Sequence, residues 1–85
     1  MSCYFEIETT PKALPEVTAI LRENDTITQI YRVTGKNKLH VHAVAASAEE
    51  MEALMREVID PLPGVIDSSC NMILSRIKDI KGLRL

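Results

Sequence analysis

Hydrophobic and polar residues alternate at the start of the chain, from Ser2 to Thr9. The hydrophobic positions are the odd-numbered residues Cys3, Phe5 and Ile7, and polar or amphipathic side chains lie between them. A period of two residues is typical of a β-strand with one buried face. We therefore predict a half-buried strand over Ser2–Thr9.

After this strand the spacing of the hydrophobic residues changes to that of a helix. Leu14, Val17, Ile20 and Leu21 recur at helical spacing, which is typical of one face of an α-helix. Pro15 is compatible with this assignment because proline is tolerated in the first turn. The pattern predicts a helix that ends around Asn24-Asp25.

Two alternating segments follow, separated by a short turn, and the first of them is rich in β-branched residues. They cover Ile27–Thr34 and Leu39–Ala46, and both alternate between hydrophobic and polar positions. Such segments favour strands, and a short turn containing glycine favours a hairpin between them. We predict a hairpin that turns at Gly35–Asn37, with a positive φ at Gly35.

The second half of the chain repeats the order helix then strand. Ser47 and Glu50 match the capping box S-x-x-E, which marks the start of a helix. Hydrophobic residues at helical spacing continue from Met51 to Ile59, and Pro61 ends the helix. The loosely alternating segment Val65–Ile77 predicts a last strand, followed by a short basic tail.

The order strand, helix, strand, strand, helix, strand predicts a ferredoxin-like α+β fold, βαββαβ. In this fold both helices cover one face of a four-stranded antiparallel sheet. The alternation assigns to the helix side Phe5, Ile7, Leu39, Val41, Ala43, Met72 and Leu74. It assigns to the open side Tyr4, Glu6, Glu8, His40, His42, Val44, Ser69, Asn71 and Ile73. The open side mixes polar and hydrophobic groups, which favours a face-to-face homodimer.

Composition narrows the class of protein. A chain of 85 residues is of the size of one domain, which we place at 1–85. A net charge of −2 and an isoelectric point near 5.6 argue against direct nucleic-acid binding. We find no membrane span or export signal. Two cysteines without C-x-x-C spacing indicate reduced thiols and a cytoplasmic location.

Two stretches are similar to one known family. They are YRVTGKNKLHVHAVAAS at 31–47 and LPGVIDSSCNMILS at 62–75. With the strand order, RVTG and LPGV at this separation resemble the effector-binding (RAM) domain of the Lrp/AsnC transcriptional regulators over nearly the whole chain. The resemblance implies dimers formed through the sheets, assemblies of dimers, and amino-acid effectors bound between dimers. It implies that transcription is regulated through a fused or partner DNA-binding domain. It implies no cofactor.

The resemblance also indicates which residues contact the effector. The family's effector loop corresponds to the turn of the hairpin, and its hydroxyl-bearing strand corresponds to the start of the last strand. Asn37 stands where the family has an aromatic residue, and Lys38 where it has an aspartate. Lys38 would repel an ammonium group and attract an acid. The implied effector-binding residues are Thr34, Gly35, Lys36, Asn37, Lys38, Ser68 and Cys70.

One other group of residues allows an alternative function. His40 and His42 lie two residues apart, so both imidazoles fall on one face of a strand, and Glu6 belongs to a neighbouring strand. Two histidines do not make a metal site, and hydrogen-bonded histidines inside a dimer are the simpler interpretation. The alternative is a small dimeric α+β barrel enzyme of the monooxygenase type, with a cavity lined by these three residues. Because no catalytic set can be assembled from spacing, we favour a non-enzymatic effector module.

Overall fold

The computed structural model describes residues 1–78, and its order of elements is the predicted one. Part of the predicted basic tail, residues 79–85, lies outside the described residues. The elements are β1 (Ser2–Thr9), α1 (Leu14–Arg22), β2 (Ile27–Val33), β3 (Lys38–Val44), α2 (Ala48–Leu54), a π-helical segment η1 (Met55–Ile59) and β4 (Val65–Met72).

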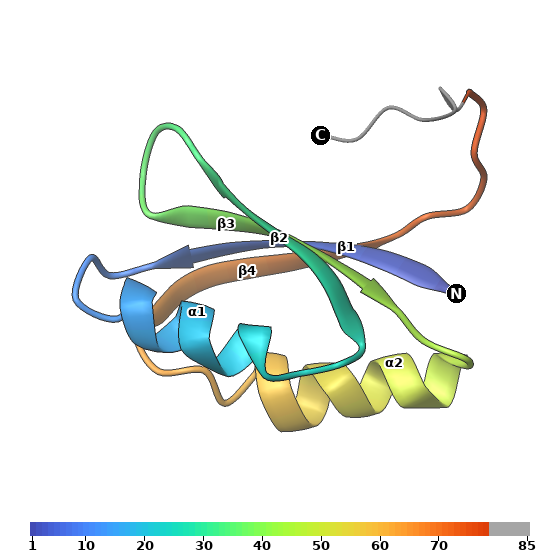
Figure 1. Ribbon diagram of the computed structural model, residues 1–85, viewed down its shortest axis with the longest axis horizontal. Helices are drawn as coiled ribbons and strands as arrows, with labels where there is room; N and C mark the ends of the chain where they lie inside the picture. The colour runs from blue at the N-terminus through green and yellow to red at the C-terminus, as the bar shows by residue number, and fades with distance from the viewer. Residues whose placement is uncertain (79–85) are drawn as a thin grey trace.

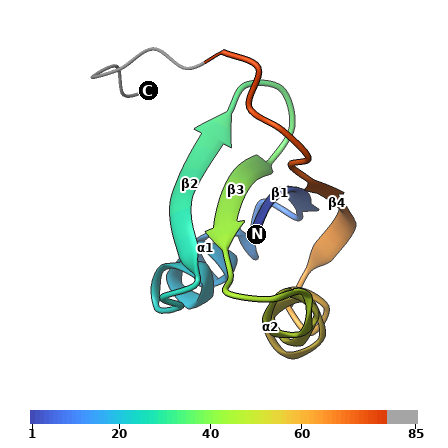
Figure 2. The same cartoon turned by 90° about the vertical axis from the view of Figure 1, so that its right-hand side faces the viewer.

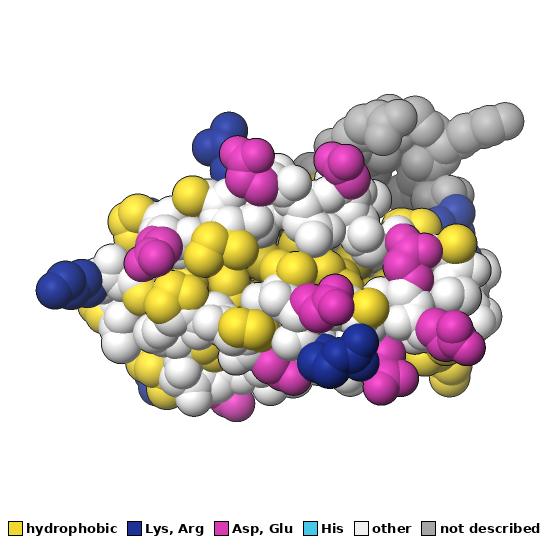
Figure 3. All heavy atoms as spheres, turned by 90° about the horizontal axis from the view of Figure 1, so that it is seen from below, with side chains coloured by type: hydrophobic (Ala, Val, Ile, Leu, Met, Phe, Trp, Pro, Cys, Tyr) yellow, Lys and Arg dark blue, Asp and Glu magenta, His cyan; other side chains and the backbone are white. Residues whose placement is uncertain are grey.

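The four strands form one antiparallel sheet in the order β2-β3-β1-β4. Both helices lie on the same side of this curved sheet, α1 near β2 and α2 nearer β4 (Figures 1 and 2). Seen from the helix side, hydrophobic side chains gather along the middle of the molecule and charged ones surround them (Figure 3). The architecture confirms the ferredoxin-like α+β fold.

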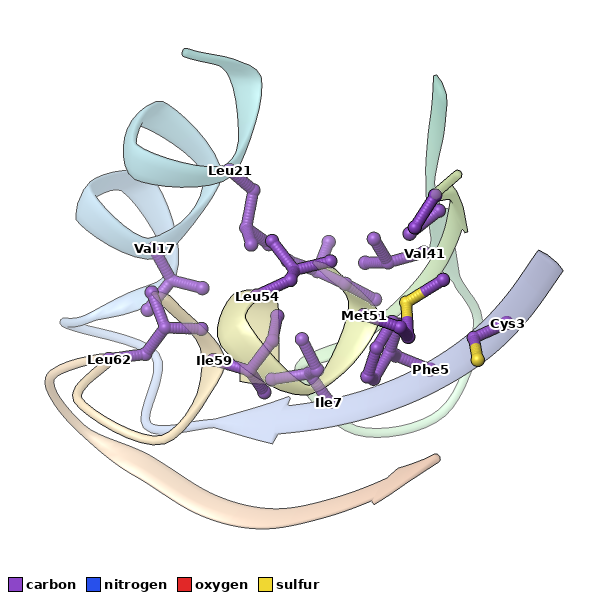
Figure 4. Close-up of a cluster of buried hydrophobic side chains, with 13 residues drawn as sticks. Cys3, Phe5, Ile7, Val17, Leu21, Val41, Met51, Leu54, Ile59 and Leu62 are labelled. Carbon is purple, nitrogen blue, oxygen red and sulfur yellow. The ribbon is translucent and has the colours of Figure 1, made fainter. Parts of the chain in front are cut away.

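The hydrophobic core lies between the two central strands and the helices. Every second residue of β1 and β3 is buried, as the alternation predicts. Phe5, Ile7 and Val41 are each at most 1% exposed and meet side chains from both helices (Figure 4). The helices contribute Val17, Leu21, Met51, Leu54 and Ile59. Burial of this apolar surface is the main force that holds the helices on the sheet.

The last strand differs from the prediction. Met72 and Leu74 were expected on the buried helix side, but their side chains are 52% and 90% exposed. Register does place Met72 on that side, opposite Cys3. However, β4 is an edge strand, so it has a neighbouring strand on one side only. Leu74 lies beyond the strand, because β1 begins at Ser2 and offers no further backbone partners.

The second helix begins as predicted and ends differently. The Glu50 N–H donates to Ser47 Oγ at 3.2 Å, and the Glu50 carboxylate accepts from the Ala46 N–H at 3.1 Å. This is a capping box in which the Glu50 carboxylate binds the N–H of the residue before the N-cap, and not the N–H of the N-cap itself. The helix then widens into η1, where the Asp60 N–H reaches the Met55 carbonyl at 2.8 Å. The spacing of the hydrophobic residues did not predict this π-helical segment.

Candidate functional site

The hairpin turn between β2 and β3 has the backbone that the sequence predicts. Gly35 has a φ of +105°, which L residues with side chains rarely adopt. The Lys38 N–H donates to the Lys36 carbonyl at 2.9 Å and closes the turn. The Thr9 N–H donates to the Asn37 carbonyl at 2.8 Å. The hairpin is therefore anchored to the end of β1.

Both lysines of the hairpin are paired with carboxylates of β1. Lys38 Nζ lies 2.9 Å from Glu6 Oε1, and Lys36 Nζ lies 3.8 Å from Glu8 Oε2. The hydrogen bond and charge of Lys38 lower the pKa of the Glu6 carboxyl, and the same contact raises the pKa of Lys38. Because Glu6 offsets the ammonium of Lys38, that lysine alone gives no reason to expect an acidic effector.

The open face of the sheet carries a polar and aromatic cluster. The Tyr4 hydroxyl is hydrogen-bonded to His40 Nδ1, and His40 Nε2 lies 3.8 Å from Glu6 Oε2. The rings of Tyr4 and His42 meet edge to face with centroids 5.3 Å apart. Burial, and then the charge of Glu6, raise the pKa of Tyr4. The structure therefore places Glu6 beside His40, as the strand order predicts, whereas His42 lies beside Tyr4.

Tyr4 is a member of this cluster that the sequence reasoning placed on the open face without giving it a role. Its position opposite His42 follows from the register of β1 and β3, which alternation alone does not fix. Within residues 1–78, no three His, Cys, Asp or Glu side chains come together closely enough to hold a metal ion. The cluster is a set of mutually paired groups.

The strand residues of the implied site lie on the other face of the sheet. Ser68 pairs with Ile7 and Cys70 with Phe5, so both side chains point to the helix side. Ser68 is exposed, whereas Cys70 is half-buried against the core. Burial, and then the neighbouring Cys3 thiol, raise the pKa of Cys70 to about 11. Cys70 is therefore a neutral thiol near pH 7.

One protomer does not bring the two parts of the implied site together. Lys38 lies next to Glu8 on the open face, whereas Ser68 lies next to Ile7 on the helix face. Strand β1 separates them, so their backbones are about 10 Å apart, which is two strand spacings. A ligand of amino-acid size cannot contact both parts within one protomer.

A groove of about 740 Å³ lies elsewhere, between α1 and β2. Its walls are mostly aliphatic, with Arg22 and Arg32 among the lining residues. None of the implied effector-binding residues lines it. In the part of the chain that the structure describes, no helix has the length and apolar character needed to cross a bilayer.

Comparison with known families gives the assignment. The family model of the Lrp/AsnC ligand binding domain matches residues 2–83. The chain belongs to this family. No curated protein matches it by sequence. The match spans β1 to β4, so the whole described fold is that of an Lrp/AsnC ligand binding domain, as the resemblance of RVTG and LPGV implied.

Solved structures share the fold of this Lrp/AsnC domain. E. coli AsnC has a TM-score of 0.82 at 18% identity, over 93% of this chain and 54% of that one. A transcriptional regulator from Neisseria meningitidis, in complex with L-Met, has a TM-score of 0.83 at 15% identity, over 98% of this chain and 55% of that one. A protein from Thermus thermophilus has a TM-score of 0.81 at 17% identity, over 92% of this chain and 98% of that one. The chain therefore spans about half the length of the first two and nearly all of the third.

Proposed function

We propose that residues 1–85 form one non-enzymatic, homo-oligomeric module that binds an amino acid or a related metabolite for a transcriptional regulator. The observation that carries this proposal is the separation of the implied site residues. The hairpin turn and Lys38 belong to the β3 side of β1, and Ser68 and Cys70 belong to its β4 side. Lys38 and Ser68 also face opposite sides of the sheet. A second protomer that brings its own β4 next to this hairpin would complete the site.

The hairpin turn supplies one half of this site, and the backbone at Gly35 is accessible there. A Cβ atom added at Gly35 would have no neighbouring atom within 4 Å, so the space beside the backbone is free for a ligand. Thr34 and Lys36 are exposed on either side. Backbone N–H groups at such a glycine can hold a carboxylate. The Neisseria relative was solved with L-Met, which supports an amino acid as the first class of ligand to test.

The mechanism follows from a site shared between protomers. A ligand that binds only the assembled form stabilises that form by its differential affinity. The regulator would then act on DNA through a fused or partner domain, because the net charge of −2 does not favour direct contact with the phosphate backbone. Regulation of transcription places the module in the cytoplasm.

A thermal-shift screen of amino acids and organic acids tests the proposal. A ligand that binds the folded state raises the melting temperature by mass action. We expect hits among amino acids, and we expect light scattering to show a change in assembly with the same compounds. A strict monomer at every protein concentration, without and with the candidate ligands, would contradict the proposal.

The enzyme alternative rests on the contacts of His40 with Tyr4 and Glu6. We assign these contacts to the structure of the open face, because each group already has a partner within the protomer. Oxygen consumption distinguishes the two functions. Turnover that is lost in His40→Ala while the assembly stays intact would favour the enzyme, whereas no turnover in either protein fits the effector module.

A further inference from the structure

The two cysteines of the chain lie next to each other in the fold. They are Cys3 and Cys70, at opposite ends of the sequence. Phe5 is the register partner of Cys70 on β1, so Cys3 and Cys70 are diagonal neighbours on the helix side of the sheet. No other thiol exists in the chain, so both cysteines belong to this one pair.

A third sulfur atom belongs to the same surface. Met72 is the direct register partner of Cys3, and side chains that face each other in this way have Cβ atoms about 5 Å apart. Cys3 is 2% exposed, Cys70 is half-buried and Met72 is 52% exposed. The exposure of these three residues therefore increases from Cys3 in the core to Met72 at the surface.

We propose that Cys3, Cys70 and Met72 form a binding site for a soft monovalent metal ion, Cu(I), with two thiolates and one thioether as ligands. Thiolate and thioether sulfur select Cu(I) over hard cations. This site does not depend on the effector proposal, because copper binding is measured without any amino acid.

The strand residues next to the cysteines offer no ligand for a hard cation. The helix-side residues of β1 and β4 around them are Phe5, Ile7 and Ser68, which offer neither a carboxylate nor an imidazole. Structural zinc sites use four nitrogen, sulfur or oxygen ligands. Within residues 1–78, no third His, Cys, Asp or Glu joins the two cysteines. A metal that accepts two or three sulfur ligands fits this set.

The strand geometry favours a bridging metal over a disulfide. Diagonal neighbours in an antiparallel pair have Cα atoms about 7–8 Å apart, whereas a disulfide usually joins residues whose Cα atoms are about 4.4–6.8 Å apart. Two metal–sulfur bonds of about 2.3 Å each allow the sulfur atoms to stay more than 4 Å apart. A metal ion can therefore bridge the two thiols without a shift of β4 against β1.

Binding is a ligand exchange without a change of oxidation state. Cu(I) displaces one proton from each thiol, and the two protons go to the solvent.

Competition with a coloured Cu(I) chelator, without oxygen, tests the site on the reduced full chain. We expect one copper ion per protomer, a copper K-edge spectrum with sulfur neighbours only, and loss of binding in Cys70→Ser. Met72→Leu should leave more of the copper with the chelator. Ser69→Ala, on the same strand but the opposite face, should bind as the wild type does.

Three results would overturn the proposal. One is copper binding in Cys70→Ser equal to that of the wild type. Another is tighter binding of Zn(II) than of Cu(I) by the wild-type chain. The third is a disulfide between Cys3 and Cys70 that forms in air, detected as a mass loss in a fold that is otherwise unchanged. Because Cys70 is only half-buried, its serine variant should fold, and circular dichroism checks this.

Discussion

At the scale of single residues, two glycines have positive φ for different reasons. Gly64 has a φ of +69°, and a Cβ atom there would lie 2.3 Å from the Cβ of Ala13. Its carbonyl accepts from the Thr10 N–H at 2.9 Å. Gly64 thus holds the entry to β4 against the start of α1. Gly35 has no such neighbour, so only its turn conformation requires glycine.

The two glycines give a matched pair of substitutions. Gly64→Ala combines a left-handed backbone with a steric overlap and should lower the free energy of unfolding by about 3 kcal/mol. Gly35→Ala meets only the backbone cost and should lower it by about 1 kcal/mol. Urea denaturation measures both values. Equal losses would show that the contact with Ala13 does not restrict this turn.

The ion pair of Lys38 with Glu6 predicts a pH effect. Lys38 holds the pKa of Glu6 below its usual value. The pair therefore stabilises the fold above the pKa of the unfolded carboxyl, and this contribution is lost as the pH falls through the folded pKa. We expect the Glu6 pKa, followed by NMR, to rise in Lys38→Ala. In Lys36→Ala, whose nearest carboxylate is Glu8, it should stay unchanged.

At the scale of elements, the start of α2 depends on one side chain. Ser47 Oγ accepts from the Glu50 N–H, which satisfies one of the free donors of the first turn. Ser47→Ala should lower the free energy of unfolding by about 1 kcal/mol. Ser75→Ala, at an exposed position beyond β4, is the control. Thermal unfolding of both variants measures the difference, and an equal melting temperature would contradict the capping role.

Most elements follow from local patterns in the sequence. The alternation over β1 and β3, the capping box and Gly35 each act within a few residues, so the sequence predicts them. The exposure of Met72 and the end of β4 depend on the length of the partner strand. The contacts of Lys38 with Glu6, and of Cys3 with Cys70, depend on register, which a single sequence fixes only weakly.

At the scale of the whole molecule, the sheet presents two different surfaces. One carries the paired cluster of Tyr4, Glu6 and His40, which no helix covers (Figure 2). The other is buried under both helices along the central strands β1 and β3, and less so along the edge strands β2 and β4. Among the effector residues, Lys38 belongs to the first surface, and Ser68 and Cys70 belong to the second. The central claim is therefore that two protomers share each ligand site.

Mixed assemblies test this claim most directly. Thr34 and Ser68 are both exposed, so Thr34→Trp and Ser68→Trp should fold while each blocks one half of the site. The measurement is the amount of a screened amino acid bound by each variant and by an equal mixture refolded together. We predict no binding by either variant alone and about one quarter of the wild-type sites in the mixture, from random pairing of protomers. Mixed assemblies that bind nothing would contradict the account. If each site lay within one protomer, every chain in the mixture would still carry a blocked site.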